Sequence, residues 1–216
     1  MEFEGFSPET VDFLWGIRMN NNREWFTAHK PAYVRYLYEP MKALGHDLFT
    51  PFLDKPGNLL KVSRIYRDAR LHHPLPYKES LWICIRQDVQ WWSENPCLFL
   101  DLHPEGVSYG FTLLKPKAST LEDFRKVIAA RPDEFLKLVA DTEKATGMPL
   151  SAELYKRPKP CPDPRLEPYF AWKTGIGCVC FEEVSPAMFG PALGQRAGEL
   201  FRKLIPIYDY FTQFRV

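Results

Sequence analysis

Apolar residues recur every three to four positions near the start of the chain, which is the spacing of a helix with one buried face. Ser7 and Pro8 precede this stretch and are residue types that favour a helix start, so we predict a helix that reaches about Met19. Three consecutive Asn residues, 20–22, interrupt the pattern because Asn ends one helix and caps the next. A second, short helix is expected over residues 23–29.

The same periodicity predicts further helices along the chain. From Pro31 it continues to Phe52, with a kink expected at Pro40. Helix-start chemistry recurs at three later points, at Thr120, at Pro132 and at Ser185. The helix from Pro132 should stop at Gly147, and the last helical region should reach about Phe214 and be kinked or split at Pro206.

Other stretches alternate between two sets of side chains, which is typical of strands. We expect strands over 80–88, 97–102, 107–114 and 175–184. The second and third should form an antiparallel hairpin, because the tetrapeptide 103–106 carries Pro and Gly at positions suited to a tight turn. Residues 156–168 contain five prolines and should be a stiff, extended loop.

Clustered strands with helices at both ends predict an α+β fold, in which a central, mainly antiparallel sheet is flanked by N-terminal and C-terminal helices. The length of 216 residues fits a single domain, 1–216. The 16 Phe, 10 Tyr and 6 Trp can fill a substantial core. No apolar stretch or leader-like N-terminus stands out, and the five cysteines are scattered, so a cytoplasmic protein with reduced thiols and no membrane contact is expected.

The net charge of +1 gives no reason for long-range attraction to a polyanion, so any anion site must be local. The strongest candidate is the basic and aromatic segment 61–78. If it is extended, alternate residues share one side and place two guanidinium groups on a phosphate or carboxylate; these residues are Arg64, Tyr66, Asp68 and Arg70. Asp68 would orient an arginine or act as a base. In a helix, Arg64 and Asp68 would instead form a surface ion pair, and the stretch would simply be solvated.

Several ordered motifs of the chain resemble a bacterial and fungal family catalogued as domain of unknown function 2461. They are 20–26 with His29 and Tyr33, 64–68, 76–78, 102–106 and 156–159. The resemblance covers nearly the whole chain and implies a shared fold and a candidate surface, but no reaction. Members usually resemble Ser-Lys-Asp-Lys before Pro-Tyr-Lys, whereas this chain has His72-His73-Pro74-Leu75. If those missing charges serve a ligand, specificity or function has changed here; if they form a solvated turn, nothing follows.

Two further segments are candidate sites. Asn22, Arg23 and His29 could line an anion site, although helix capping explains the Asn residues without a ligand and is the favoured interpretation. The cationic loop 156–159 could close over an anion or could merely be solvated.

Metal and cofactor sites find little support. Asp101 and His103 share one face of a predicted strand, and so do Cys178 and Cys180, but two ligands do not make a site. No glycine-rich phosphate loop, nucleophile elbow or dinucleotide fingerprint is present. We therefore expect no metal and no cofactor.

The leading hypothesis is a small-molecule site for a phosphate- or carboxylate-bearing ligand, and catalysis there is left open. Its expected binding residues are Arg64, Arg67, Asp68, Arg70, Tyr77, Lys78, Asn22, Arg23 and His29. The alternative is a non-catalytic domain that binds nucleic acid or protein, with Tyr66, Tyr77, Trp91 and Trp92 as stacking surfaces. A third hypothesis is that all these motifs are structural. The sequence does not define an oligomeric state.

Overall fold

The computed structural model describes residues 2–68, 74–157 and 159–214. Its centre is one antiparallel sheet with the strand order β1-β2-β3-β4-β6-β5. The strands are β1 (Asn58–Val62), β2 (Leu81–Gln87), β3 (Cys97–His103), β4 (Gly106–Leu113), β5 (Ser151–Leu154) and β6 (Trp172–Glu183). The predicted α+β class is confirmed.

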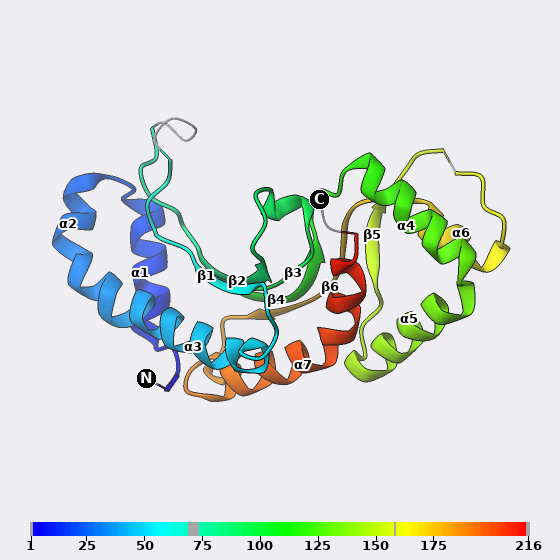
Figure 1. Cartoon of the computed structure of the whole chain (residues 1–216). Coiled ribbons are helices and arrows are strands. Elements are labelled where there is room, and N and C mark those ends of the chain that lie inside the picture. Colours follow the sequence, from blue (N-terminus) through cyan, green and yellow to red (C-terminus); the bar gives the residue numbers. More distant parts are fainter. Residues whose placement is uncertain (1, 69–73, 158, 215–216) are drawn as a thin grey trace.

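Helices cover one face of the sheet and stand at its two ends (Figure 1). The N-terminal helices are α1 (Pro8–Met19), α2 (Arg23–Ala32) and α3 (Glu39–Phe49), and the others are α4 (Ala118–Ala130), α5 (Pro132–Thr146), α6 (Glu167–Phe170) and α7 (Ala192–Thr212). The long α7 packs on β3 and β4, and α3 packs on β1 and β2. In Figure 1 the opposite face of the sheet lies uncovered by α-helices, between the α1–α2 end and the α4–α6 end.

The alternation of side chains along each strand separates the core from the open face. Ile83, Leu100 and Tyr109 lie side by side on the buried face, and Phe111 in β4 contacts Phe211 of α7 with ring centroids 5.6 Å apart. On the open face, register aligns one residue from each of four strands: Trp82, Asp101, Ser108 and Phe181. A polar row with aromatic ends therefore crosses the uncovered side of the sheet.

The chain stays helical from α2 into α3 through a π-helical turn, Tyr33–Tyr38, so Pro31 lies inside α2 and does not start a helix as expected. Pro40 has no N–H for the Tyr36 carbonyl four residues earlier. The buried Thr10 hydroxyl donates to that carbonyl instead, at 2.6 Å. A side chain of α1 thus replaces the missing backbone donor.

Two strands, β1 and β5, were not predicted. β1 lacks clean alternation, since its residues are mostly half-buried, and β5 is short and largely exposed. Helix α7 passes Pro206 as one helix, so the expected split is wrong. Within the described residues, no helix is both long enough and apolar enough to cross a membrane.

Candidate functional site

Residues 63–68, which follow β1, and residues 74–80, which precede β2, form two arms that pair with each other. Tyr66 and Tyr77 form an antiparallel bridge, the Arg67 N–H donates to the Pro76 carbonyl at 2.9 Å, and the Lys78 N–H donates to the Ile65 carbonyl at 2.7 Å. The described part of the segment, up to residue 68 and from residue 74, is therefore extended, which agrees with one of the two interpretations of its sequence. Ile65 and Arg67 lie on one side of this extended stretch and Tyr66 on the other: Ile65 is fully buried, Arg67 is half-buried and Tyr66 is exposed.

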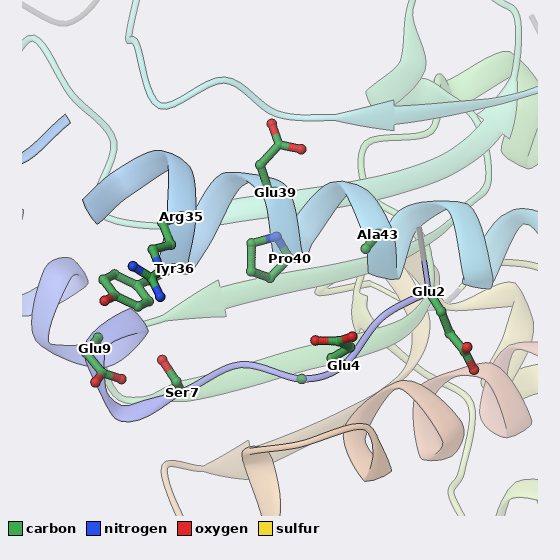
Figure 2. A pocket seen from close by; sticks show the side chains of 10 residues that line it. Glu2, Glu4, Ser7, Glu9, Arg35, Tyr36, Glu39, Pro40 and Ala43 are labelled. Atoms are coloured by element: carbon green, nitrogen blue, oxygen red, sulfur yellow. The ribbon is translucent and has the colours of Figure 1, made fainter. Parts of the chain in front are cut away.

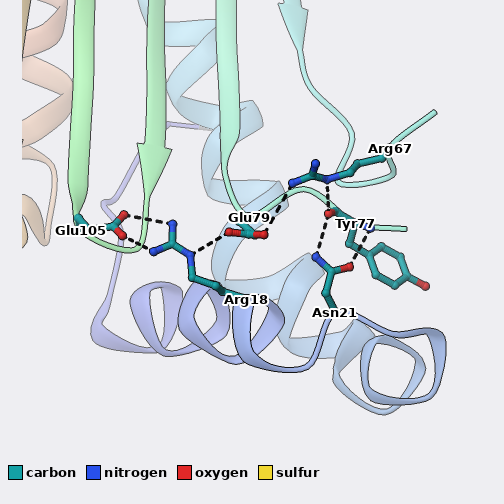
Figure 3. A network of polar contacts seen from close by, with 6 residues as sticks. All are labelled: Arg18, Asn21, Arg67, Tyr77, Glu79 and Glu105. Atoms are coloured by element: carbon teal, nitrogen blue, oxygen red, sulfur yellow. Dashed lines mark hydrogen bonds and ion pairs between the residues drawn. The ribbon is translucent and has the colours of Figure 1, made fainter. Parts of the chain in front are cut away.

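The arms are fastened to the N-terminal helices through Tyr77. The Asn21 side chain accepts from the Tyr77 N–H and donates to the Tyr77 carbonyl, both at 3.0 Å (Figure 3). The Tyr77 ring is buried against Phe26, with centroids 4.3 Å apart. The Arg67 Nε donates to the same Tyr77 carbonyl at 2.6 Å. One backbone unit thus connects α1–α2, the arms and a cationic side chain.

A chain of ion pairs joins α1 to the sheet beside this point (Figure 3). The Arg18 Nε donates to Glu79 at 2.9 Å, and its terminal nitrogens contact the Glu105 carboxylate in the β3–β4 turn. Arg67 lies 3.7 Å from the other Glu79 oxygen. These contacts raise the pKa of Arg18 and lower that of Glu105. Both carboxylates are therefore neutralised by arginine.

Above these pairs lies a pocket of about 390 Å³. Its lining comes from α1, the arms and β3: Arg18, Arg67, Lys78, Glu79, Ser80 and His103. The Lys78 ammonium donates to the Arg64 carbonyl at 2.8 Å and lies 5.4 Å from the centre of the Trp82 ring. Burial lowers the pKa of Lys78, and the nearby Asp101 carboxylate partly opposes that change.

His103 lines the pocket from β3, and Asp101 lies beside it on the same strand without being one of the described lining residues. His103 Nε2 lies 3.7 Å from Asp101 Oδ2. Asp101 Oδ1 is buried and has no hydrogen-bond partner among the described residues. Burial raises the pKa of Asp101, whereas His103, Ser80 and Lys78 act in the opposite direction. A carboxylate and an amine whose pKa values both move toward neutrality, beside an imidazole, can hold and transfer protons.

Comparison with protein families identifies the chain. A family model described as conserved hypothetical protein (DUF2461) matches residues 9–210. The chain belongs to the DUF2461 family. The match includes every residue that lines the pocket, so this site lies within the part of the chain that defines the family. A comparison with curated proteins found no match.

The structure of this DUF2461 chain brings together only some of the residues proposed from its sequence. Arg67 and Lys78 line the pocket, and Tyr77 supports it from the core. Arg64 and Asp68 are exposed and are not among the described lining residues. Arg70, with His72 and His73 of the segment that departs from the family pattern, lies outside the described residues.

The predicted residues of α2 lie elsewhere. Asn22 caps the helix by accepting from the Trp25 N–H at 2.9 Å, as the favoured interpretation had it. The exposed His29 ring stacks on Trp25 at 3.9 Å, and its Nδ1 is 2.8 Å from the Trp25 carbonyl oxygen. Arg23 is exposed and is near enough to Tyr77 to oppose the rise in its phenol pKa. None of the three is among the described residues that line the pocket.

Sequence reasoning did not assign four residues that line this pocket, Arg18, Glu79, Ser80 and His103, or the neighbouring Asp101. The alternation of β3 placed Asp101 and His103 on one face, which was the available signal. Their proximity to Lys78 depends on the pairing of Trp82 with Asp101, and a single sequence does not state that register.

A second hollow, of about 370 Å³, lies between the N-terminal segment and α3 and is mainly acidic (Figure 2). Its charged lining residues are Glu2, Glu4, Glu9, Glu39 and Arg35. Among the described residues, no group of three or more His, Cys, Asp or Glu side chains is arranged to hold a metal ion. This hollow therefore offers no match to an anionic ligand, and we place the candidate site at the mixed-charge pocket.

Proposed function

We propose that the pocket around Lys78 binds a small molecule that carries a phosphate or carboxylate group together with a hydrogen-bond donor. The observation that carries this proposal is the convergence of Arg67, Lys78 and His103, from separate segments, beside a buried Asp101 oxygen without a partner. Binding sites combine a concave shape with a few such polar groups.

The cationic half of the pocket suits the anionic group. An ammonium has three N–H donors, and the one hydrogen bond from Lys78 to a described residue goes to the Arg64 carbonyl. Its partial burial strengthens attraction to an anion because the local dielectric is lower than in water. Arg18 has a different role: by neutralising Glu79 and Glu105, it reduces their repulsion of an incoming anion.

The side of the pocket next to Asp101 offers a hydrogen-bond acceptor and therefore suits a donor on the same ligand. A buried carboxylate oxygen without a partner is costly, and a ligand N–H or O–H directed at Asp101 Oδ1 would remove that cost. This requirement favours hydroxy or amino acids and phosphorylated alcohols over simple anions such as sulfate. Asp101 and His103 would also be placed to move a proton on such a ligand, and a reaction is not assigned.

A thermal-shift screen of small hydroxy acids, amino acids and sugar phosphates, followed by calorimetry, tests the proposal. A true ligand raises the melting temperature by mass action. Lys78→Met should weaken its binding at least about tenfold, as expected for loss of one charge-assisted contact of about 1.4 kcal/mol. Lys126→Met is the matched control, because Lys126 is an exposed lysine on α4 paired with Asp123. Equal affinity in the two variants would refute the proposal.

The alternative remains a non-catalytic domain that binds nucleic acid or protein. Exposed aromatic side chains favour it: Trp91 and Phe181 are more than half exposed, and Trp92 stacks on Trp82 of the open face. Tyr77 is buried and does not offer a stacking surface. Fluorescence anisotropy with a single-stranded oligonucleotide tests it. Binding that falls steeply with salt and is lost in Phe181→Ala would support this alternative, and no binding at low salt would exclude nucleic acid as the partner.

A further inference from the structure

A third hollow lies at the β5 edge of the sheet, at the opposite end from the Lys78 pocket. It has a volume of about 510 Å³ and is lined by Leu154, Tyr155, Lys156, Arg157, Lys159 and Lys173. Four of these six side chains are cationic and none is acidic. They come from the end of β5, the loop that follows it and β6, so folding brings together charges that the sequence separates by up to 17 positions.

These four cations have no counter-ion among the described residues. Among the described residues, the ion pairs include Arg18, Lys55, Arg165 and Arg196, but none includes a residue of this hollow. Like charges held close together destabilise a fold. In a chain with a net charge of only +1, this local excess is a structural cost that a bound anion would relieve.

The hollow has an ordered wall. The Lys159 ammonium lies 5.0 Å from the centre of the Tyr155 ring, and the Arg125 guanidinium lies 5.5 Å from it. Arg125 is itself buried and donates to the carbonyls of Phe170 and Trp172 at 3.0 and 2.9 Å. Tyr155 is thus held by two cations, and this engagement disfavours its use as a stacking surface for a nucleic-acid base.

We propose that this hollow is a second anion site, independent of the Lys78 pocket, and that it binds a compact polyanion with linked phosphate groups. A single phosphate would neutralise only part of the charge of Lys156, Arg157, Lys159 and Lys173, whereas a short phosphate chain carries several charges within the same hollow. A single strand of nucleic acid fits less well, because the cations are gathered in one hollow beside an engaged tyrosine.

Calorimetry at low ionic strength with inorganic tripolyphosphate tests this site. Tripolyphosphate should bind the wild-type chain at least about tenfold more tightly than orthophosphate. Lys156→Gln, Lys159→Gln and Lys173→Gln should each weaken binding about fivefold, as expected for one charge pair in a largely aqueous setting. Lys126→Gln should change nothing, and Lys78→Met should retain tripolyphosphate binding, which separates this site from the first.

A second measurement guards against variants that merely misfold. Without ligand and at low salt, the triple Gln variant should melt no lower than the wild-type chain, because removing like charges relieves repulsion. Three results would overturn the proposal: equal affinity for tripolyphosphate and orthophosphate, unchanged tripolyphosphate binding in the triple variant, or tighter binding of a single-stranded oligonucleotide than of tripolyphosphate. The last result would identify a nucleic-acid site instead.

Discussion

Replacement of Arg125 by Met should destabilise the chain through one specific group of contacts. Arg125 is 9% exposed, and its guanidinium donates to the carbonyls of Phe170 and Trp172. Phe170 ends α6, where carbonyls lack a helical partner, so the guanidinium completes that helix end. Methionine fills a similar space but donates no hydrogen bond.

The magnitude follows from the two carbonyls. A buried acceptor that loses its donor costs about 1 to 3 kcal/mol, which gives about 2 to 6 kcal/mol for two. Removing the guanidinium also removes the cost of burying its charge, which has no ion pair among the described residues and offsets part of this loss. We therefore expect Arg125→Met to lower the free energy of unfolding by about 2 to 4 kcal/mol, a large share of the about 5 to 15 kcal/mol typical of a domain.

Urea unfolding followed by tryptophan fluorescence and far-UV circular dichroism measures this change. The midpoint should fall while the slope stays constant. Arg125→Lys keeps a charge and can reach one carbonyl, so its loss should be about half as large. Lys126→Met, at the exposed neighbouring position, should stay within about 0.5 kcal/mol of wild type. A Met variant as stable as the wild-type chain would refute the reasoning, because the burial cost would then cancel both hydrogen bonds.

Three further predictions concern the sheet and its pocket. Burial raises the pKa of Asp101, so the folded state binds this proton more tightly than the unfolded chain, and stability falls as pH rises from about 4 through the raised value. Asp101→Asn should therefore gain more in melting temperature over wild type at pH 7 than at pH 4; an equal difference at both would contradict this. Asn21→Ala loses both hydrogen bonds to the Tyr77 backbone and should cost about 1 to 3 kcal/mol in urea unfolding, against less than about 0.5 kcal/mol for Asn20→Ala, whose side-chain hydrogen bond to the Gly16 carbonyl is exposed to water. Gly110 has a φ of 151°, and an added Cβ would lie 2.1 Å from the Cys178 carbonyl oxygen, so Gly110→Ala should cost at least about 3 kcal/mol or abolish soluble expression, and a wild-type-like midpoint would be inconsistent with the tight β4–β6 contact.

Local chemistry was sufficient to predict much of the fold. Ser7 and Pro8 start α1, Gly147 adopts the left-handed conformation that ends α5, and alternation defines β2, β3 and β4. The missed elements lack local signals. β5 is a short edge strand with exposed side chains, and its existence depends on pairing with β6.

The candidate site was predictable only in part, because it is made by long-range contacts. The basic segment contributed Arg67 and Lys78, but the side of the strand that faces the pocket was not evident until burial of Ile65 fixed it. The register between β2 and β3 brings Asp101 and His103 close to Lys78. The packing of α1 against the end of the sheet brings Arg18 to the pocket. A sequence shows which residue types are available, whereas the fold decides which of them meet.

The near-zero net charge of this chain conceals a strong asymmetry. Carboxylates of Glu2, Glu4, Glu9 and Glu39 surround the hollow near the N-terminus, and four cations surround the hollow at the β5 edge. The N-terminus and β5 lie in different halves of the molecule (Figure 1). Two separated patches of opposite charge contribute a dipole along the line that joins them, which favours one orientation of the molecule in an electric field although the net charge is small. Ionic strength, more than distance from the isoelectric point, should therefore govern which end meets a charged surface first.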